Sequence, residues 1–243
     1  MTTSGWCWLA AAGVCAVIDW IAVGAGRRRL ERIAKPLTML GLLAVALSAH
    51  SAPARSWLVL ALLLGLLGDI ALVAEQRPAL APAGVQVVTR ASARGTASGR
   101  PRAGLSADPR PFLIGLSAFL AGHLAYVVAL TRFGIDQLSA VFGLLLVLIA
   151  LLSFGYRVLA GAHEIGGGTL TAGLVLYVVA LGSVVVLGVG TGQLWIATGS
   201  VLFAASDLML GYDRFVLARS WSALAVIVTY HLAQGLLVIG LLR

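Results

Sequence analysis

The chain has 243 residues, of which 60% are hydrophobic and only 11% are charged, and its mean hydropathy is +1.00. A soluble domain carries roughly 25% charged residues, so this composition excludes a water-soluble globular protein and predicts one that is solvated by lipid. The net charge of +8 does not indicate nucleic-acid binding, because the basic residues lie in loops between apolar segments.

Eight apolar segments meet or approach the roughly 20 residues that a helix needs to cross the hydrocarbon core. In chain order they are residues 6–25, 36–52, 57–74, 110–130, 138–158, 168–189, 193–212 and 221–242. The expected fold is therefore all-α, a single polytopic integral membrane domain (residues 1–243) with eight transmembrane helices. Residues 75–109 are rich in Pro, Gly, Ala, Ser and Arg and have no periodicity, which predicts a flexible cytoplasmic loop.

The distribution of Lys and Arg predicts how these helices are oriented. The loops after the first, third, fifth and seventh helices hold 5, 6, 1 and 2 basic residues, 14 in total, against 3 on the opposite side (Arg55, Arg132 and Arg243). Short loops rich in Lys and Arg remain in the cytoplasm, so both termini are expected on the outer face. The expected location is the plasma (inner) membrane of a bacterium.

A short internal similarity relates the third and fourth expected helices to the seventh and eighth. Residues 68–72 read GDIAL and residues 206–210 read SDLML, and the next helix in each case carries His-Leu-Ala, at 123–125 and at 231–233. Two four-helix halves of the same orientation would form a parallel 4+4 pseudo-repeat with its axis along the membrane normal. Coincidence in an apolar sequence of low complexity is the alternative.

Three aspartates, Asp19, Asp69 and Asp207, fall inside expected membrane helices, where an ionisable group costs about 2.5–3.5 kcal/mol and so indicates function. Asp69 and Asp207 each lie about five residues from the cytoplasmic end of their helices, roughly 8 Å below that surface. Two carboxylates that share a site cannot both ionise easily, so such a pair supplies one acid and one base. The alternative is that each carboxylate is only hydrogen-bonded to a neighbouring helix.

Further polar side chains lie in the fourth and eighth expected helices. His123 and Tyr126 share one helix face, and Tyr230 precedes His231 and Gln234, which also share a face. No HxxxH or HExxH spacing occurs in the sequence, so neither a metal nor another cofactor is expected.

Two basic residues lie at the cytoplasmic ends of expected helices. Lys35, the only lysine, opens the second helix beside Pro36. Its ammonium could pair with Asp19 in the first helix, extend to the membrane surface, or meet a lipid phosphate. Arg214 follows the seventh helix and could line an anion site at the same interface.

The order and spacing of these residues resemble the YhhN family of membrane proteins, whose characterised members are lysoplasmalogenases. The resemblance runs from about residue 30 to the C-terminus, and its positions are Lys35-Pro36, Gly68-Asp69, Phe112, Gly115, Phe119, His123, Tyr126, Phe203, Ser206-Asp207, Arg214-Phe215, Tyr230 and Ala233-Gln234. Residues 75–109 depart from it, because the family usually has a short connection there.

The resemblance implies hydrolysis of the vinyl ether bond of a lysophospholipid to a fatty aldehyde and a glycerophospho-alcohol, without a cofactor. Asp69 and Asp207 would be the catalytic acid–base pair. Substrate-binding or orienting roles are implied for Lys35, His123, Tyr126, Arg214, Tyr230, His231 and Gln234. The expected partners are the lysophospholipid and membrane lipids but no nucleic acid, and the sequence leaves the oligomeric state open.

Two other classes of function compete with this interpretation. A proton-coupled transporter or lipid-binding membrane protein would also carry Asp and His inside the membrane, and a parallel repeat would suit alternating access. The outer halves of the helices are mostly Leu, Val and Ala, however, and offer no polar path across the membrane. A hydrolase acting on another lipid ether or ester is the third possibility.

Overall fold

The structure, a computed structural model, describes residues 2–49, 52–75 and 110–243. These ranges contain helices and no strand, which confirms the all-α class. The helices are α1 (Thr3–Gly24), α2 (Arg28–Ser48), α3 (Arg55–Glu75), α4 (Arg110–Leu130), α5 (Gln137–Ala150), the π-helix η1 (Leu151–Gly155), α6 (Tyr156–Gly190), α7 (Leu194–Phe215) and α8 (Ser222–Leu241). The expected cytoplasmic loop, apart from its first residue, lies outside the described residues.

Six helical stretches of the described chain are long and apolar enough to cross a membrane. One of them, Gln137–Gly190, has 54 residues and contains α5, η1 and α6. Large apolar side chains are exposed on the outer surfaces of the helices, among them Leu152 at 73% and Leu194 at 75%. Only lipid can cover so much apolar surface, so the chain is an integral membrane protein.

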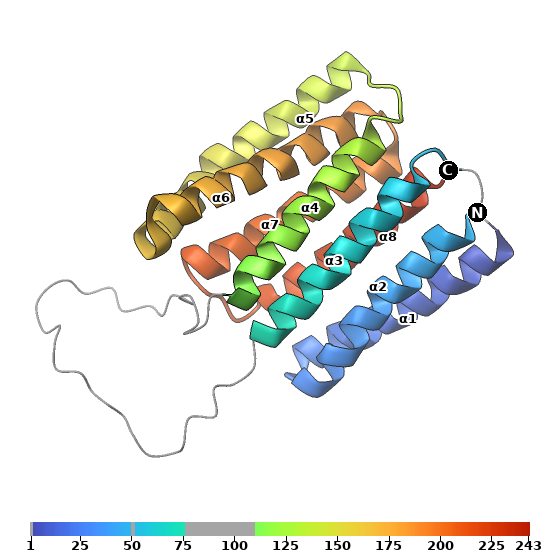
Figure 1. Cartoon of the computed structure of the whole chain (residues 1–243), viewed down its shortest axis with the longest axis horizontal. Coiled ribbons are helices and arrows are strands. Elements are labelled where there is room, and N and C mark those ends of the chain that lie inside the picture. Colours follow the sequence, from blue (N-terminus) through green and yellow to red (C-terminus); the bar gives the residue numbers. More distant parts are fainter. Residues whose placement is uncertain (1, 50–51, 76–109) are drawn as a thin grey trace, which may run out of the picture.

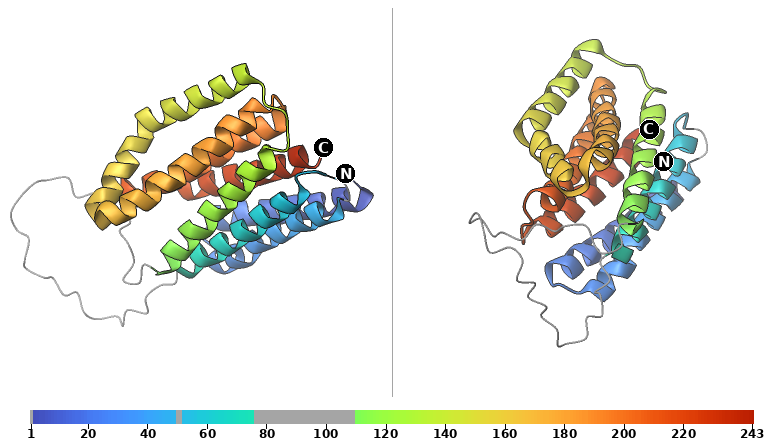
Figure 2. Two further views of the ribbon diagram at one scale, coloured as in Figure 1. Left: turned by 45° about the horizontal axis from the view of Figure 1, so that its top comes forward. Right: turned by 60° about the vertical axis from the view of Figure 1, so that its left-hand side comes forward.

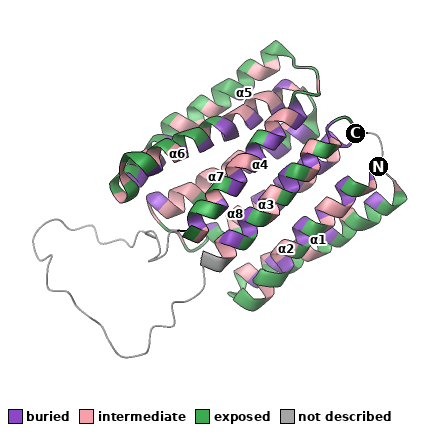
Figure 3. Cartoon of the chain, viewed as in Figure 1, coloured by how far each residue is buried: buried purple, intermediate pink, exposed green. Residues whose placement is uncertain are grey.

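The helices form a central group of four that is flanked by two helical hairpins (Figure 1 and Figure 2). In the centre α3 packs against α4, and α7 packs against α8. On one side α1 and α2 pack against α8 and α3, and on the other side α6 packs against α7 and α4 with α5 outside it. The two termini lie at the same end of the bundle (Figure 1). Buried residues line the facing sides of the helices, and exposed residues cover the outer surfaces of α1 and α5 (Figure 3).

The long helix α6 contains the point where the chain turns back along α5. Gly167 has a φ of 63° and a ψ of −159°, a conformation that glycine adopts without a steric penalty, and it divides α6 into two parts. The second part packs closely on α5, since an ideal Cβ atom at Gly143 would lie 3.0 Å from the Cα atom of Val186. The connection expected at residues 159–167 is therefore helical up to the reversal at Gly167.

Helix α2 begins at Arg28, eight residues before the expected start at residue 36, and Pro36 lies inside it. Proline lacks an N–H group, so one backbone hydrogen bond of the helix is missing at this position. Because of the early start, Lys35 lies inside the helix, and the helix fixes the direction of its side chain. The side chain extends to α3.

Two glycines of α3 allow neighbouring helices to approach the face that carries Asp69. An ideal Cβ atom at Gly68 would lie 2.6 Å from the ring of Phe119 in α4, so any side chain at this position would require that ring to move. An ideal Cβ atom at Gly65, one turn before Asp69, would lie 3.4 Å from the hydroxyl of Tyr230 in α8. The lack of side chains on this part of α3 thus lets α4 and α8 bring aromatic groups to the carboxylate.

Candidate active site

Asp69 lies in α3 and receives polar groups from α2 and α8. The ammonium nitrogen Nζ of Lys35 lies 2.9 Å from Oδ1 of Asp69, and the hydroxyl of Tyr230 donates to Oδ2 at 3.0 Å. The Asp69 side chain is 1% exposed and that of Lys35 is 15% exposed, so this ion pair is removed from solvent. Charges buried in this way are tolerated when they are paired and hydrogen-bonded. Lys35 and Tyr230 both favour the ionised form of Asp69, whereas its burial opposes ionisation.

Asp207 lies in α7 and receives uncharged or weakly basic groups from α6 and α4. The hydroxyl of Tyr177 donates to Oδ2 of Asp207 at 2.5 Å, and Nε2 of His123 lies 3.3 Å from the same oxygen. The rings of His123 and Tyr177 meet edge to face, with centroids 4.9 Å apart. His123 is fully buried, whereas the Asp207 side chain is 8% exposed. Asp207 is therefore oriented through one oxygen and keeps access to its surroundings.

The ring of Phe203 connects the two carboxylate clusters. Its centroid lies 5.8 Å from that of Tyr230, whose hydroxyl donates a hydrogen bond to Asp69. It lies 4.9 Å from the ring centroid of His123, whose Nε2 atom contacts Asp207. The structure thus brings both sequence-predicted aspartates to one region of the bundle, each with partners of its own.

Tyr126 and Gln234 form a buried pair beside these clusters. The Tyr126 hydroxyl donates a short hydrogen bond to Oε1 of Gln234, and both residues are almost completely buried. The ring of Tyr126 also meets Phe203 edge to face, with centroids 5.9 Å apart. These residues therefore belong to the same polar region as the aspartates.

His231 lies outside this region and faces α1. Its Nε2 atom lies 3.9 Å from Oδ2 of Asp19, and its ring stacks on that of Trp20 with centroids 6.5 Å apart. Lys35, for which Asp19 was one expected partner, instead contacts Asp69. Asp19 and His231 therefore form a separate buried pair between α1 and α8.

Arg214 lies in the last turn of α7, two turns beyond Asp207. Its guanidinium group lies over the ring of Phe112, 4.4 Å from the centroid. The neighbouring Asp213 contacts Arg219, with 3.1 Å between Oδ1 and Nε. Arg214 is thus held at the end of the bundle rather than at either carboxylate.

Tyr177 is the residue of this region that sequence reasoning missed. It is the only tyrosine in the apolar segment 168–189, and a hydroxyl within a membrane helix needs a polar partner. That signal could have identified it, although the sequence does not show which partner it would meet. Among the described residues, no group of three or more His, Cys, Asp or Glu side chains is arranged to hold a metal ion.

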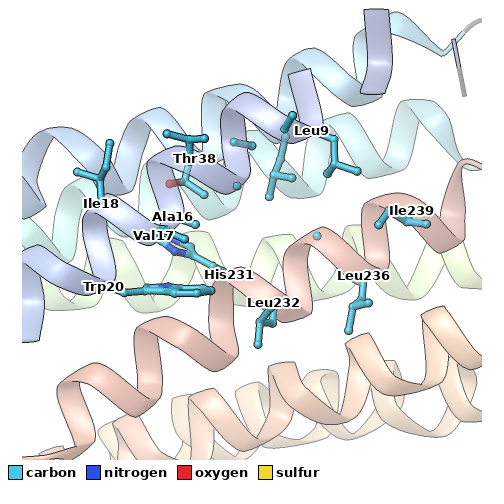
Figure 4. A pocket seen from close by; sticks show the side chains of 16 residues that line it. Leu9, Ala16, Val17, Ile18, Trp20, Thr38, His231, Leu232, Leu236 and Ile239 are labelled. Atoms are coloured by element: carbon cyan, nitrogen blue, oxygen red, sulfur yellow. The ribbon is translucent and has the colours of Figure 1, made fainter. Parts of the chain in front are cut away.

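Two apolar pockets open between the helices on opposite sides of the central group. The first, which we call the α5–α7 pocket, has a volume of about 380 Å³, and its walls are α5, η1, α6 and α7; Tyr177 and Asp207 line it. The second, the α1–α8 pocket, has about 660 Å³ and lies between α1, α2 and α8 (Figure 4). His231, Trp20 and Thr38 are its polar lining residues, and the aliphatic side chains of Leu9, Leu236 and Ile239 lie farther along it (Figure 4).

Comparison with known proteins gives matches over most of the chain. The sequence model of the YhhN family matches residues 30–88 and 103–241, which leave out only α1 and the first two residues of α2 among the helices described. A protein named lysoplasmalogenase from Mycobacterium bovis (strain ATCC BAA-935 / AF2122/97) is 34% identical over 133 residues, which cover 53% of this chain and 50% of that protein.

Two mammalian proteins are similar to the same extent. Proteins named lysoplasmalogenase TMEM86B from Mus musculus and Homo sapiens are each 34% identical, over 138 and 141 residues, and the matches cover 56% of this chain and 56% of each relative. The chain thus spans about half the length of the curated relatives it matches. No solved structure matches the chain.

Proposed function

Because the chain belongs to the YhhN family, we propose that it is a membrane-embedded hydrolase that cleaves the vinyl ether bond of lysoplasmalogens. The names of its curated relatives support this activity. The observation that carries the proposal is the placement of Asp207: it is hydrogen-bonded to Tyr177, contacts His123, and lines an apolar pocket. A lipid chain and a proton donor can therefore meet there.

The first chemical step is protonation of the vinyl ether by Asp207. The π electrons of the carbon–carbon double bond take the Asp207 proton onto the β-carbon, which leaves an oxocarbenium ion shared by the α-carbon and the ether oxygen. Tyr177 and His123 both contact Oδ2 of Asp207, so we assign the transferred proton to Oδ1. Because neither of these partners is a lysine or an arginine, we assign Asp207 the role of general acid.

The second step is capture of the oxocarbenium ion by water. The water oxygen bonds to the α-carbon and its proton passes to a carboxylate, which gives a hemiacetal. As the hemiacetal collapses, its hydroxyl proton passes to the ionised Asp207 and the proton that Asp69 took from water passes to the ether oxygen. The bond between the α-carbon and the ether oxygen breaks, which yields a fatty aldehyde and the glycerophospho-alcohol and restores both carboxyl groups. Asp69, held ionised by Lys35, supplies the negative charge that favours the cation and the base for the water. Acid–base catalysis of this kind contributes about 10²–10⁴-fold.

The other polar residues support these two carboxylates. Tyr126 and Gln234, beside Phe203, are suited to orient the water or the ether oxygen. Arg214 is suited to bind the lysolipid phosphate, because it lies at the end of α7 beyond Asp207. His231 acts at a distance from the reacting bond, since its partners are Asp19 and Trp20.

We further propose that the chain crosses the membrane eight times, with both termini outside, in the plasma membrane of a bacterium. The stretch Gln137–Gly190 would be about 81 Å long as one straight helix, against about 30 Å of hydrocarbon, and it turns back at Gly167. α2 lies beside α1 and α3, so it crosses with them. An even number of spans agrees with termini at the same end of the bundle (Figure 1).

The partners of the two aspartates support a parallel 4+4 repeat. Asp69 of α3 takes Lys35 from the preceding helix, α2, and Tyr230 from the last helix of the other half, α8. Asp207 of α7 takes Tyr177 from the preceding helix, α6, and His123 from the last helix of the other half, α4. Exchanging the two halves therefore maps the helices that supply one cluster onto those that supply the other. The residues are offset by one position in α4 and α8, since the His-Leu-Ala similarity aligns His123 with His231 and the contacts relate His123 to Tyr230.

Aldehyde release from a purified lysoplasmalogen tests the activity and the catalytic pair together. In detergent, Asp207→Asn and Asp69→Asn should each lower the rate by at least about 10²-fold, because each removes one proton-transfer group. Asp136→Asn, at an exposed position before α5, is the matched control and should keep the wild-type rate. Undiminished activity in either catalytic variant would refute the acid–base pair, and an inactive wild type would favour a transporter or another lipid substrate.

A further inference from the structure

The α5–α7 pocket has the composition of a site for a hydrocarbon chain. Its volume of about 380 Å³ is within the range of ligand pockets, and its lining is Leu, Val, Ile, Ala, Phe and Gly apart from Ser153, Tyr177 and Asp207. Four of the five residues of η1 line it, and π-helical turns of this kind occur frequently at functional sites. An apolar ligand could therefore bind with one end at a carboxyl group.

The carboxyl group divides the pocket into a long and a short part. Along α7 the pocket extends from Asp207 to Val201, six residues or about 9 Å away, and along α6 from Tyr177 to Val185, eight residues or about 12 Å away. In the other direction it extends only one helical turn, to Gly211. The long part can take the chain of a lipid, and the short part leads to the end of the bundle.

We propose that the α5–α7 pocket binds the alkenyl chain of the lysolipid, with the vinyl ether beside Asp207 and the chain directed toward Val185 and Val201. This inference rests on the proposed function. It assigns the chain-length preference of the enzyme to the far end of the pocket, and it makes Asp207 the carboxyl group that meets the substrate.

The charges at the short end of the pocket agree with this direction. Val158 lines that end beside Gly211, and the exposed Arg157 precedes it in the sequence. Arg214 lies at the same end of α7. The glycerophosphate follows the ether oxygen in a lysoplasmalogen, so its negative charge would lie toward these two guanidinium groups.

The α1–α8 pocket does not meet the same requirements, although it is larger. Its polar lining residues are Trp20, Thr38 and His231, and none of them is a carboxylate (Figure 4). A chain bound there would hold its vinyl ether away from both Asp69 and Asp207. The position of Asp207 therefore decides between the two pockets.

Chain-length preference tests the inference separately from the activity. We would compare kcat/KM for lysoplasmalogens with an eight-carbon and an eighteen-carbon alkenyl chain. Val201→Phe shortens the pocket at its far end and should lower kcat/KM for the long chain about tenfold, the effect of leaving about two methylene groups unburied, with little change for the short chain. Ala204→Leu, one turn before Asp207, should lower both values.

Gly235→Leu is the matched control, because it fills the α1–α8 pocket and a Cβ atom at Gly235 meets no atom within 4 Å. This variant should keep the wild-type ratio of the two kcat/KM values. A changed ratio in Gly235→Leu with an unchanged ratio in Val201→Phe would overturn the inference while leaving the proposed function intact. An inactive wild type would instead overturn the proposed function.

Photolabelling gives a second readout that does not require turnover. A lysolipid with a diazirine at the end of a long chain should label peptides that contain Val185 or Val201 in the full-length protein. Labelling confined to α1 and α8, at unchanged elution of the protein from a sizing column, would refute the assignment of the chain to the α5–α7 pocket.

Discussion

Asp69 in α3 and Asp207 in α7 have different kinds of partner. Asp69 is paired with the ammonium group of Lys35 from α2, whereas Asp207 accepts a hydrogen bond from the hydroxyl of Tyr177 in α6. Asp69 is 1% exposed, and Asp207 is 8% exposed at the wall of a pocket. Asp69 is thus held in an ion pair with a lysine, whereas Asp207 is held by a tyrosine and a histidine.

This difference in partners is the basis on which we propose that one aspartate serves as the acid and the other as the base. An adjacent cation favours the ionised form of a carboxylate, and neutral hydrogen-bond partners in an apolar setting do not. In the proposed mechanism, the lysine beside Asp69 and the tyrosine beside Asp207 separate the two roles. The comparison therefore predicts that the two clusters respond differently when their partners are removed.

The largest effect on stability is expected for Lys35→Met. This change leaves the Asp69 carboxylate buried without its cation, which costs about 3–5 kcal/mol when one partner of a buried ion pair is removed. Thermal unfolding in detergent would show a markedly lower midpoint than for the wild type.

The double variant Lys35→Met with Asp69→Leu provides the control. Because it replaces the whole ion pair by apolar groups, most of the lost stability should return, although activity should not. If the double variant is no more stable than Lys35→Met alone, Lys35 does not act through Asp69, and a direct role in phosphate binding becomes the better interpretation.

A smaller and asymmetric effect is expected for the two tyrosine hydroxyls. In the proposed mechanism Asp69 is the ionised base and Asp207 the proton donor. On that assignment Tyr230→Phe removes a hydrogen bond to a charged group and should cost about 1.5–3 kcal/mol of stability, whereas Tyr177→Phe removes one to an uncharged group and should cost about 0.5–1.5 kcal/mol. Thermal unfolding midpoints of the two variants, measured under the same conditions, show which variant is less stable. The reverse order would show that Asp207 carries the negative charge.

The smallest effect is expected for Asp136, a carboxylate outside the apolar stretch that begins at Gln137. Its side chain accepts a hydrogen bond from the Ser139 amide at 2.7 Å and caps α5, and this bond lowers the pKa of Asp136 below its usual value. Because the pKa of Asp136 is lower in the folded chain than its usual value, this group stabilises the folded chain at any pH above the usual value. That stabilisation is lost as the pH falls through the lowered pKa.

The unfolding midpoint should therefore drop slightly in Asp136→Ala at neutral pH and converge with that of the wild type in strong acid. Asp136→Ser retains a capping oxygen and should lose less stability at neutral pH. A difference between wild type and Asp136→Ala that persists unchanged in strong acid would contradict the capping role.

Sequence reasoning was sufficient for the fold class and the family, because both depend on composition, segment length and motif order. It also singled out Asp69 and Asp207, since a charge in an apolar segment is conspicuous. It left the partner of Lys35 open, and it missed Tyr177, because contacts between helices depend on rotations about their axes that periodicity does not fix. The early start of α2 and the helical connection to Gly167 are further examples, in which tertiary packing extended a helix past its expected boundary.

The close approach at Gly68 restricts how this site can change over evolutionary time. The missing side chain at Gly68 accommodates the ring of Phe119, which meets the ring of Tyr230 edge to face with centroids 6.2 Å apart, and Tyr230 holds Asp69. A methyl group at position 68 would displace the ring of Phe119, and through it the ring of Tyr230 that holds the Asp69 carboxylate. Drift at these positions must therefore be concerted: a larger residue at 68 is tolerable only after a smaller one has arisen at 119.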